Sequence, residues 1–161
     1  MNNKIDDLRM NEIEEKDYQT AKKIFNKLFS KYTVQFEKMK TGSVSDMRFQ
    51  ILKKDGDVVK YNVEIKSRTQ SLDDYDTLPL TVQKYCNLKD DTQEWERLIY
   101  ISLVNDEEYY IFDLNKLDWN KVDCHNWFIN DIEFSTGQPT KKKIPTYFIP
   151  IAQACYNGLI N

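Results

Sequence analysis

Apolar residues recur at helical spacing in the N-terminal part of the chain. Six of them lie three or four positions from another member of the set, which places them on one face of an α-helix. They are Tyr18, Ala21, Ile24, Phe25, Leu28 and Phe29. We expect an amphipathic helix from Ile13 to about Lys31, preceded by a polar, frayed segment at residues 1–11.

Alternating apolar and polar residues then predict two β-strands. Positions 47, 49 and 51 are apolar in the first run, and positions 59, 61, 63 and 65 are apolar in the second. Because successive side chains of a strand point to opposite faces, the polar residues of both strands share the other face. In the second strand these are Lys60, Asn62, Glu64 and Lys66.

An Asp-Gly pair at positions 55–56 separates the two runs and is a strong hairpin signal. A two-residue turn would set the polar face of one strand against the apolar face of the other, so the pattern favours a three-residue loop. Two such loops remain open. A loop of residues 54–56 sets Asp46 opposite Glu64, whereas a loop of residues 55–57 sets Asp46 opposite Lys66.

Either register gathers Asp46, Glu64 and Lys66 on one face of the sheet. Directly opposed side chains in such a pair are about 5 Å apart at Cβ, so the two carboxylates repel each other. The Lys66 ammonium or a bound divalent cation could offset this repulsion. The spacing therefore predicts a metal site on the polar face of the hairpin.

The rest of the chain predicts more strands and one short helix. The expected elements are a first strand at 33–36, a polar loop at 67–76, a helix that begins at Pro79 and carries Lys84, two central strands at 97–104 and 109–112, and an edge strand at 144–151. Residues 127–132 fit neither period clearly. No internal repeat or linker interrupts the chain, so we expect a single domain over residues 1–161.

A helix, a strand preceded by Asp46, a strand ending in Val63-Glu64-Ile65-Lys66, and then a helix and further strands resemble the PD-(D/E)xK nuclease superfamily. The resemblance implies an α/β fold with a restriction-endonuclease-like core, in which helices flank a mixed central β-sheet. It also implies that Asp46, Glu64 and the Ile65 carbonyl bind Mg²⁺, which Mn²⁺ could replace, and that Asp46, Glu64 and Lys66 are catalytic. Ser45 departs from the motif, because it stands where the family name has Pro.

The resemblance extends to further candidate residues. Some family members use an acid from the first helix, which corresponds here to Asp17 or Glu14, and others place a Lys after the motif, which corresponds to Lys84. Basic residues that could contact nucleic acid are Arg68, Lys141, Lys142 and Lys143, the last three within a predicted loop.

Charge and cysteine content limit this picture. The 23 Lys and Arg residues against 26 Asp and Glu residues give a net charge of −3, so any nucleic-acid surface must be local. Three widely separated cysteines without a CxxC motif suggest neither a disulfide framework nor a zinc cluster, and we expect buried or neutral thiols. Because no apolar run approaches the roughly 20 residues of a membrane helix and no signal peptide is visible, we expect a cytoplasmic protein with no membrane contact.

The sequence therefore predicts a Mg²⁺-dependent deoxyribonuclease of the endonuclease type, with DNA as substrate. The acidic charge leaves room for a homodimer or for a partner that delivers the DNA. The alternative is a nuclease-fold module that binds nucleic acid or a protein partner and has lost its catalytic activity. A structural protein with solvated, separated acids is a third hypothesis.

Overall fold

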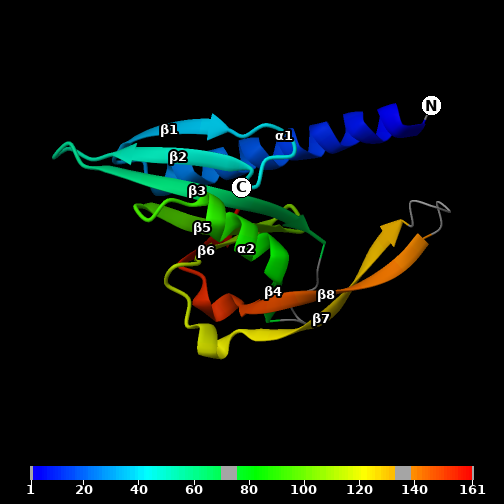
Figure 1. Ribbon diagram of the computed structural model, residues 1–161. Helices are drawn as coiled ribbons and strands as arrows, with labels where there is room; N and C mark the ends of the chain where they lie inside the picture. The colour runs from blue at the N-terminus through cyan, green and yellow to red at the C-terminus, as the bar shows by residue number, and fades with distance from the viewer. Residues whose placement is uncertain (1, 70–75, 133–138, 161) are drawn as a thin grey trace.

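The computed structural model describes residues 2–69, 76–132 and 139–160 and has a mixed α/β architecture (Figure 1). A six-stranded sheet has the order β1-β2-β3-β5-β6-β9, and a three-stranded sheet has the order β4-β8-β7. The elements are α1 (Asn2–Leu28), β1 (Thr33–Lys38), β2 (Met47–Leu52), β3 (Val58–Arg68), β4 (Thr77–Thr81), α2 (Val82–Asp91), β5 (Glu96–Val104), β6 (Glu108–Asp113), η1 (Trp119–Lys121), β7 (Asp123–Ile132), β8 (Pro139–Pro150), η2 (Ile151–Gln153) and β9 (Tyr156–Leu159). The predicted central mixed sheet with flanking helices is confirmed.

Helix α1 covers one face of the six-stranded sheet. Its apolar stripe, with Ala21 and Phe25 almost fully buried, packs on the alternating apolar residues of β2 and β3. Phe25 and Phe49 rings lie 4.6 Å apart between centroids, and Phe49 stacks on Tyr61 at 4.4 Å. The predicted amphipathic face is therefore the surface that holds the helix on the sheet.

The β2–β3 hairpin has the first of the two predicted registers. The Lys53 N–H donates to the Asp57 carbonyl at 2.9 Å, so residues 54–56 form the loop, and Gly56 has a φ of 90°. Only glycine adopts this left-handed conformation at little cost. The strand pairs run from Leu52↔Val58 to Met47↔Val63, and continuing this register sets position 46 opposite position 64.

Strands β3 and β5 lie at the centre of the larger sheet. They pair in parallel from Lys60↔Glu96 to Arg68↔Val104, and β6 pairs antiparallel with the other edge of β5. Side chains of β5 are buried on both faces, as its nearly continuous apolar sequence predicts. The first layer of the core lies under α1, and a second layer lies on the opposite face.

Helix α2 and the three-stranded sheet form this second layer. Leu88 of α2 is fully buried with Tyr100 of β5 and Ile149 of β8 in one cluster. The prediction that Pro79 begins the helix is wrong, because Pro79 lies in β4 and the Thr81 hydroxyl caps the helix by accepting from the Lys84 N–H. Pro is tolerated in β4 because this strand is an edge of its sheet.

Two other expectations are corrected by the fold, and a third falls mostly outside the described residues. Residues 2–11 are helical rather than frayed, since they continue α1, whose Glu- and Lys-rich sequence has good helix propensity. Strand β8 is the centre of its sheet rather than an edge, because β7 (whose residues 127–132 had no clear pattern) pairs along its other side. Residues 70–75, most of the predicted polar loop, lie outside the described residues.

The cysteines are also not buried. Cys86, Cys124 and Cys155 are all free and exposed, because they lie on the outer surfaces of α2 and β7 and just before β9. In the ranges that the structure describes, no helix is long and apolar enough to cross a membrane.

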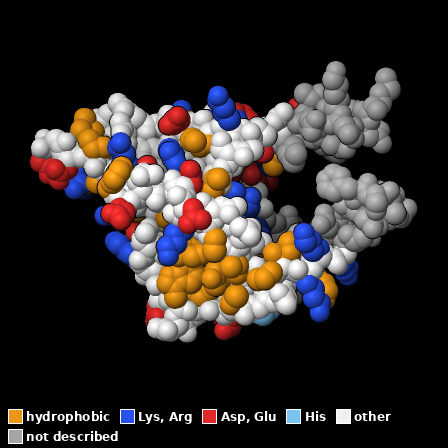
Figure 2. Space-filling model, viewed as in Figure 1, with side chains coloured by type: hydrophobic (Ala, Val, Ile, Leu, Met, Phe, Trp, Pro, Cys, Tyr) orange, Lys and Arg blue, Asp and Glu red, His pale blue; other side chains and the backbone are white. Residues whose placement is uncertain are grey.

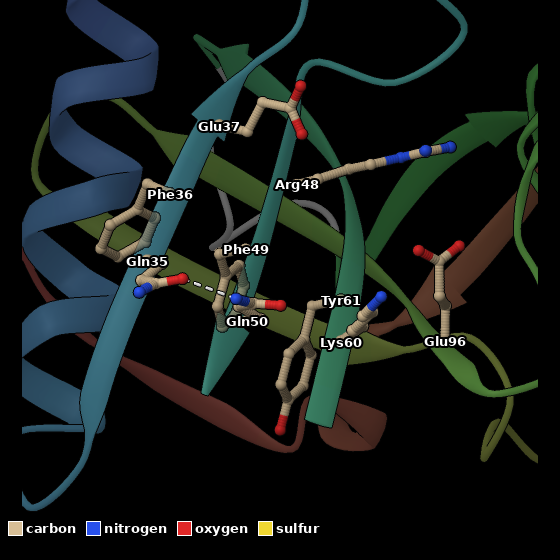
Figure 3. Close-up of a pocket in the computed structure, with 9 residues that line it drawn as sticks. All are labelled: Gln35, Phe36, Glu37, Arg48, Phe49, Gln50, Lys60, Tyr61 and Glu96. Atoms are coloured by element: carbon tan, nitrogen blue, oxygen red, sulfur yellow. Dashed lines mark hydrogen bonds between the residues drawn. The ribbon is translucent and has the colours of Figure 1, made fainter. Parts of the chain in front are cut away.

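The polar face of β1, β2 and β3 forms a shallow hollow of about 360 Å³ (Figure 3). The Gln50 side-chain amide of β2 donates a 2.6 Å hydrogen bond to the Gln35 side chain of the neighbouring strand β1. Lys60 and Glu96 also line the hollow. The Arg48 guanidinium forms an ion pair of 2.9 Å with Asp91, at the end of α2. Acidic and basic side chains are mixed here, so the hollow has no strong preference for an anion or a cation.

The fold predicts a contrast between two valines of β3. Val63→Ala removes a fully buried side chain beneath α1 and should lower the free energy of unfolding by about 1 to 3 kcal/mol. Val58→Ala is the matched control because Val58 is 49% exposed in the same strand, and it should cost less than about 0.5 kcal/mol. Urea denaturation measures both. Equal losses would contradict the assignment of the two residues to different faces and depths.

Candidate active site

Glu64 is a completely buried carboxylate on the polar face of β3. Its Oε1 lies 2.9 Å from Lys66 Nζ, and its Oε2 lies 2.9 Å from Lys84 Nζ. Lys66 comes from the same strand face, as the alternating pattern predicts, and Lys84 comes from the first turns of α2. Lys84 also donates to the Val44 carbonyl at 2.7 Å, so its ammonium group lies between α2, β3 and the segment before β2.

Asp46 lies one residue before β2, where the chain leaves the regular ladder. Its N–H donates to the Val63 carbonyl at 3.0 Å, although the register pairs position 46 with position 64. The Asp46 Oδ2 accepts a 2.7 Å hydrogen bond from the Ile65 N–H. The carboxylate therefore accepts a backbone hydrogen bond from β3 just beyond the point where β2 stops pairing with it.

Beyond Val63, the edge of β3 that faces β2 has no partner strand in the described part of the chain. The N–H and C=O of one strand residue point to the same side, as the paired bonds of a ladder show. Because the Ile65 N–H bonds to Asp46 on this edge, the Ile65 carbonyl points to this edge as well. The Asp46 carboxylate and the Ile65 carbonyl therefore lie at the same edge of β3, and the Asp46 charge also acts on Glu64.

Helix α1 adds a third carboxylate to this end of β3. The Ser67 hydroxyl donates a 2.6 Å hydrogen bond to Asp17 Oδ1, and the Thr41 hydroxyl donates to Glu14 Oε2 at 3.3 Å. A cavity of about 110 Å³ opens between α1, the segment after β1 and the end of β3. Its lining includes Glu14, Asp17, Asp46, Ile65 and Lys66.

The electrostatics of the cavity follow from burial and from opposed charges. Burial raises the pKa of Glu64 above its ordinary value, the Asp46 carboxylate adds to this increase, and the two lysines oppose it. Burial acts to lower the pKa of Lys66, but the Glu64 and Asp46 carboxylates outweigh it, and the pKa is raised overall. Burial also raises the pKa of Asp17, against its hydrogen bond from Ser67.

The donor atoms are suited to a hard divalent cation. Both Glu64 oxygens are buried, and each lies 2.9 Å from a lysine ammonium group. One Asp46 oxygen bonds to backbone, which leaves Oδ1 for a ligand, and the Ile65 carbonyl adds a neutral oxygen. Mg²⁺ is commonly bound by one or two carboxylates, with water and substrate oxygens completing the shell. Among the described residues, no group of three His, Cys, Asp or Glu side chains is arranged to hold a metal ion, so this would be a two-carboxylate site.

Other predicted residues lie elsewhere. Arg68 is partly buried, and its guanidinium donates to the Pro79 carbonyl and, at 2.9 Å, to the Tyr100 hydroxyl. Lys141, Lys142 and Lys143 lie in β8 rather than in a loop, and they do not line the cavity that Asp46 and Lys66 border. Sequence reasoning missed Ser67, whose signal was its place two residues after Ile65 on the same face of β3.

No protein-family model and no curated protein sequence matches the chain. Among solved structures, the fold is similar to that of Hjc, a Holliday junction resolvase from Archaeoglobus fulgidus. The two share 9% sequence identity with a TM-score of 0.43, over 79% of this chain and 85% of that chain. A likeness at this level carries no argument about function, which rests below on the geometry of this chain.

The site predicts energetic coupling between Glu64 and Lys84. Breaking a buried ion pair costs up to about 3 to 5 kcal/mol, and because Lys84 is partly exposed we expect about 1 to 3 kcal/mol for Glu64→Gln without metal. Glu64→Gln combined with Lys84→Gln should cost clearly less than the sum of the two single losses. Urea denaturation in EDTA measures the cycle. The exposed Lys16–Asp106 pair is the control and should show much weaker coupling, whereas additivity at Glu64 would contradict the ion pair.

Proposed function

We propose that the protein is a Mg²⁺-dependent nuclease that hydrolyses phosphodiester bonds in DNA at Asp46, Glu64 and Lys66. The observation that carries this proposal is the fully buried Glu64 carboxylate, which has two ammonium groups at 2.9 Å and Asp46 beside it. If these charges only held the fold together, an ion pair at the surface would do so with a lower desolvation cost than a buried one. Clusters of perturbed charges that border a cavity are typical of active sites.

The residues have distinct roles in this proposal. Asp46, Glu64 and the Ile65 carbonyl would hold the ion, and Asp17 or Glu14 could complete the site from α1 through water. When bound, Mg²⁺ would neutralise charge on the phosphate and make a nearby water more acidic. Lys66 would supply a positive charge and hydrogen bonds rather than bind the metal, because an ammonium group has no lone pair to offer.

Lys66 acts on the reacting water and phosphate. Its side chain is 44% exposed and lines the cavity, so its ammonium group can donate a hydrogen bond to the attacking oxygen and stabilise the negative charge that develops. The water oxygen forms a bond to phosphorus and gives up one proton to solvent, while the bond from phosphorus to one ester oxygen breaks and that oxygen takes up a proton from solvent. Lys84 is a positioning residue, since it holds Glu64 Oε2 and contacts the Val44 carbonyl.

DNA as the substrate, cutting within the strand and a cytoplasmic location follow from the resemblance to PD-(D/E)xK nucleases and from the sequence. The net charge of −3 provides no general attraction to a polyanion, so local basic residues, a second copy or a delivery partner must supply it.

One observation favours a second function, that of a nuclease-fold module without catalytic activity. Both Glu64 oxygens are charge-compensated by lysines, and Asp46 is bonded to the backbone, so the site is stable without an ion. Such a module would bind nucleic acid or a protein partner and would not hydrolyse it. Metal binding and cleavage separate the two functions.

The first test is metal affinity. Asp46→Ala should weaken Mn²⁺ binding at least about ten-fold by titration calorimetry, because it removes one of two anionic ligands. Lys66→Ala should keep or slightly raise the affinity, since a nearby positive charge is lost. Asp57→Ala, in the hairpin turn, is the matched control. Parental affinity in Asp46→Ala would place the metal site elsewhere.

The second test is cleavage of plasmid, linear and branched DNA with Mg²⁺, Mn²⁺ or EDTA. Lys66→Ala should lower kcat at least about 10²-fold, because the ammonium group acts mainly in the transition state. Lys66→Arg should restore little, since a planar guanidinium does not replace a compact ammonium group. The exposed Lys54→Ala should cleave like the parent. An inactive parent, or an active Lys66→Ala, would favour the module without catalytic activity.

A further inference from the structure

Strands β7 and β8 form a two-stranded ribbon that leaves the body of the protein. Strand β4 pairs with β8 only from Thr77↔Pro150 to Thr81↔Thr146, whereas β7 and β8 continue as a pair out to Ile132↔Pro139. We call residues 126–132 and 139–145 the arm. In Figure 1 the arm and the N-terminal half of α1 both extend past the C-terminal end of β3, the end that carries Glu64 and Lys66.

Strand alternation gives the arm two different faces. On one face Phe128 pairs with Lys143, whose Nζ lies 5.2 Å from the centre of the Phe128 ring, and Lys141 is two residues away. On the other face are Trp127 and Lys142. The basic side chains are visible on the surface over β7 and β8 in Figure 2.

The Phe128 face turns toward the body of the protein at the base of the ribbon. Tyr147 continues this face along β8 and packs on Tyr85 of α2 and on Trp119, with ring centroids 5.7 and 5.1 Å away. The opposite face is occupied differently, because Trp127 packs edge-on against Phe148 at 5.3 Å. Trp127 therefore packs against another ring of the protein, whereas Phe128 lies on the opposite face of the arm.

Phe128 contributes little to the core. It is 54% exposed, although burying a phenylalanine side chain is among the larger stabilising contributions to a fold. Lys141, Lys142 and Lys143 form no ion pair with a described residue, so their positive charge is free to attract an anion. An exposed ring between lysines is how proteins bind single-stranded nucleic acid, because the ring stacks on a base and the lysines neutralise phosphates.

We propose that the Phe128 face of the arm binds an unpaired DNA strand next to the cleavage site, with Lys141 and Lys143 on its phosphates and Phe128 on a base. The inference rests on the proposed nuclease function and narrows its substrate to DNA with single-stranded segments, such as flaps or branches. Duplex DNA fits less well, because its bases are already stacked and offer no free face to the ring.

The test uses the full-length protein in EDTA, which prevents cleavage, and fluorescence anisotropy with labelled single-stranded, flapped and duplex oligonucleotides of equal length. The parent should bind the first two at least about ten-fold more tightly than the duplex. Phe128→Ala should weaken binding to unpaired DNA about ten-fold with an unchanged salt dependence. Lys141→Gln with Lys143→Gln should weaken binding and reduce the slope of log Kd against log salt by about 1 to 2.

The opposite face of the arm supplies the matched controls. Trp127→Ala and Lys142→Gln should each stay within about two-fold of the parent in affinity for the flap. The double variant Lys53→Gln with Lys54→Gln removes two positive charges between β2 and β3, away from the arm, and controls for the change in net charge. Circular dichroism checks folding, and Phe128→Leu keeps an apolar side chain without the stacking ring, so it should lose affinity as Phe128→Ala does.

Equal effects from the two faces, equal parental affinity for duplex and unpaired DNA, or parental binding by Phe128→Ala would each overturn the arm proposal. These failures are distinct from failure of the nuclease. A parent that binds flaps through Phe128 but cleaves nothing would keep the arm and remove the nuclease. If the parent cleaves DNA and Phe128→Ala has an unchanged KM, the nuclease proposal stands and the arm proposal fails.

Discussion

The burial of one negative charge is the constraint on which this end of the molecule depends. A carboxylate with no exposure, such as Glu64, loses its hydration, and several kcal/mol of that loss must be recovered from opposite charges. Lys66 and Lys84 provide them at 2.9 Å, one from β3 and one from α2. Because Lys84 also holds the Val44 carbonyl, three separate segments of the chain are positioned by a single carboxylate. Any change in the charge of Glu64 therefore acts on all three.

A second set of contacts ties the two sheets together only a few residues further along β3. The Arg68 guanidinium donates to the Pro79 carbonyl of β4 and to the Tyr100 hydroxyl of β5, and Tyr100 is itself fully buried. The end of β3 is thus fixed to the smaller sheet by a hydrogen bond from a guanidinium to a neutral carbonyl, and to α2 by an ion pair. The proposed nuclease would need its site held firmly in this way to position a phosphate.

Sequence alone predicted the hairpin and its charged face because both depend on local rules. Alternation sets the faces, and Gly56 adopts the left-handed turn that leaves Asp46 opposite Glu64. The burial of Glu64 could not be predicted, because it depends on α2, which supplies Lys84 and shares a core cluster with the smaller sheet, and that sheet joins residues 77–81 to residues 146–150. Pro79 illustrates the difficulty, since a proline suits a helix start and an edge strand equally well until the strand partner is known.

The open edge of β3 gives Ile65 two independent constraints. Its side chain is buried under α1, while its backbone faces the cavity beside Asp46. Volume in the core restricts which residue can occupy this position, but the carbonyl is supplied by every residue type. Alanine scanning would therefore report Ile65 as a packing residue only, and the contribution of its backbone to the cavity would become visible only through replacement of the amide itself by an ester.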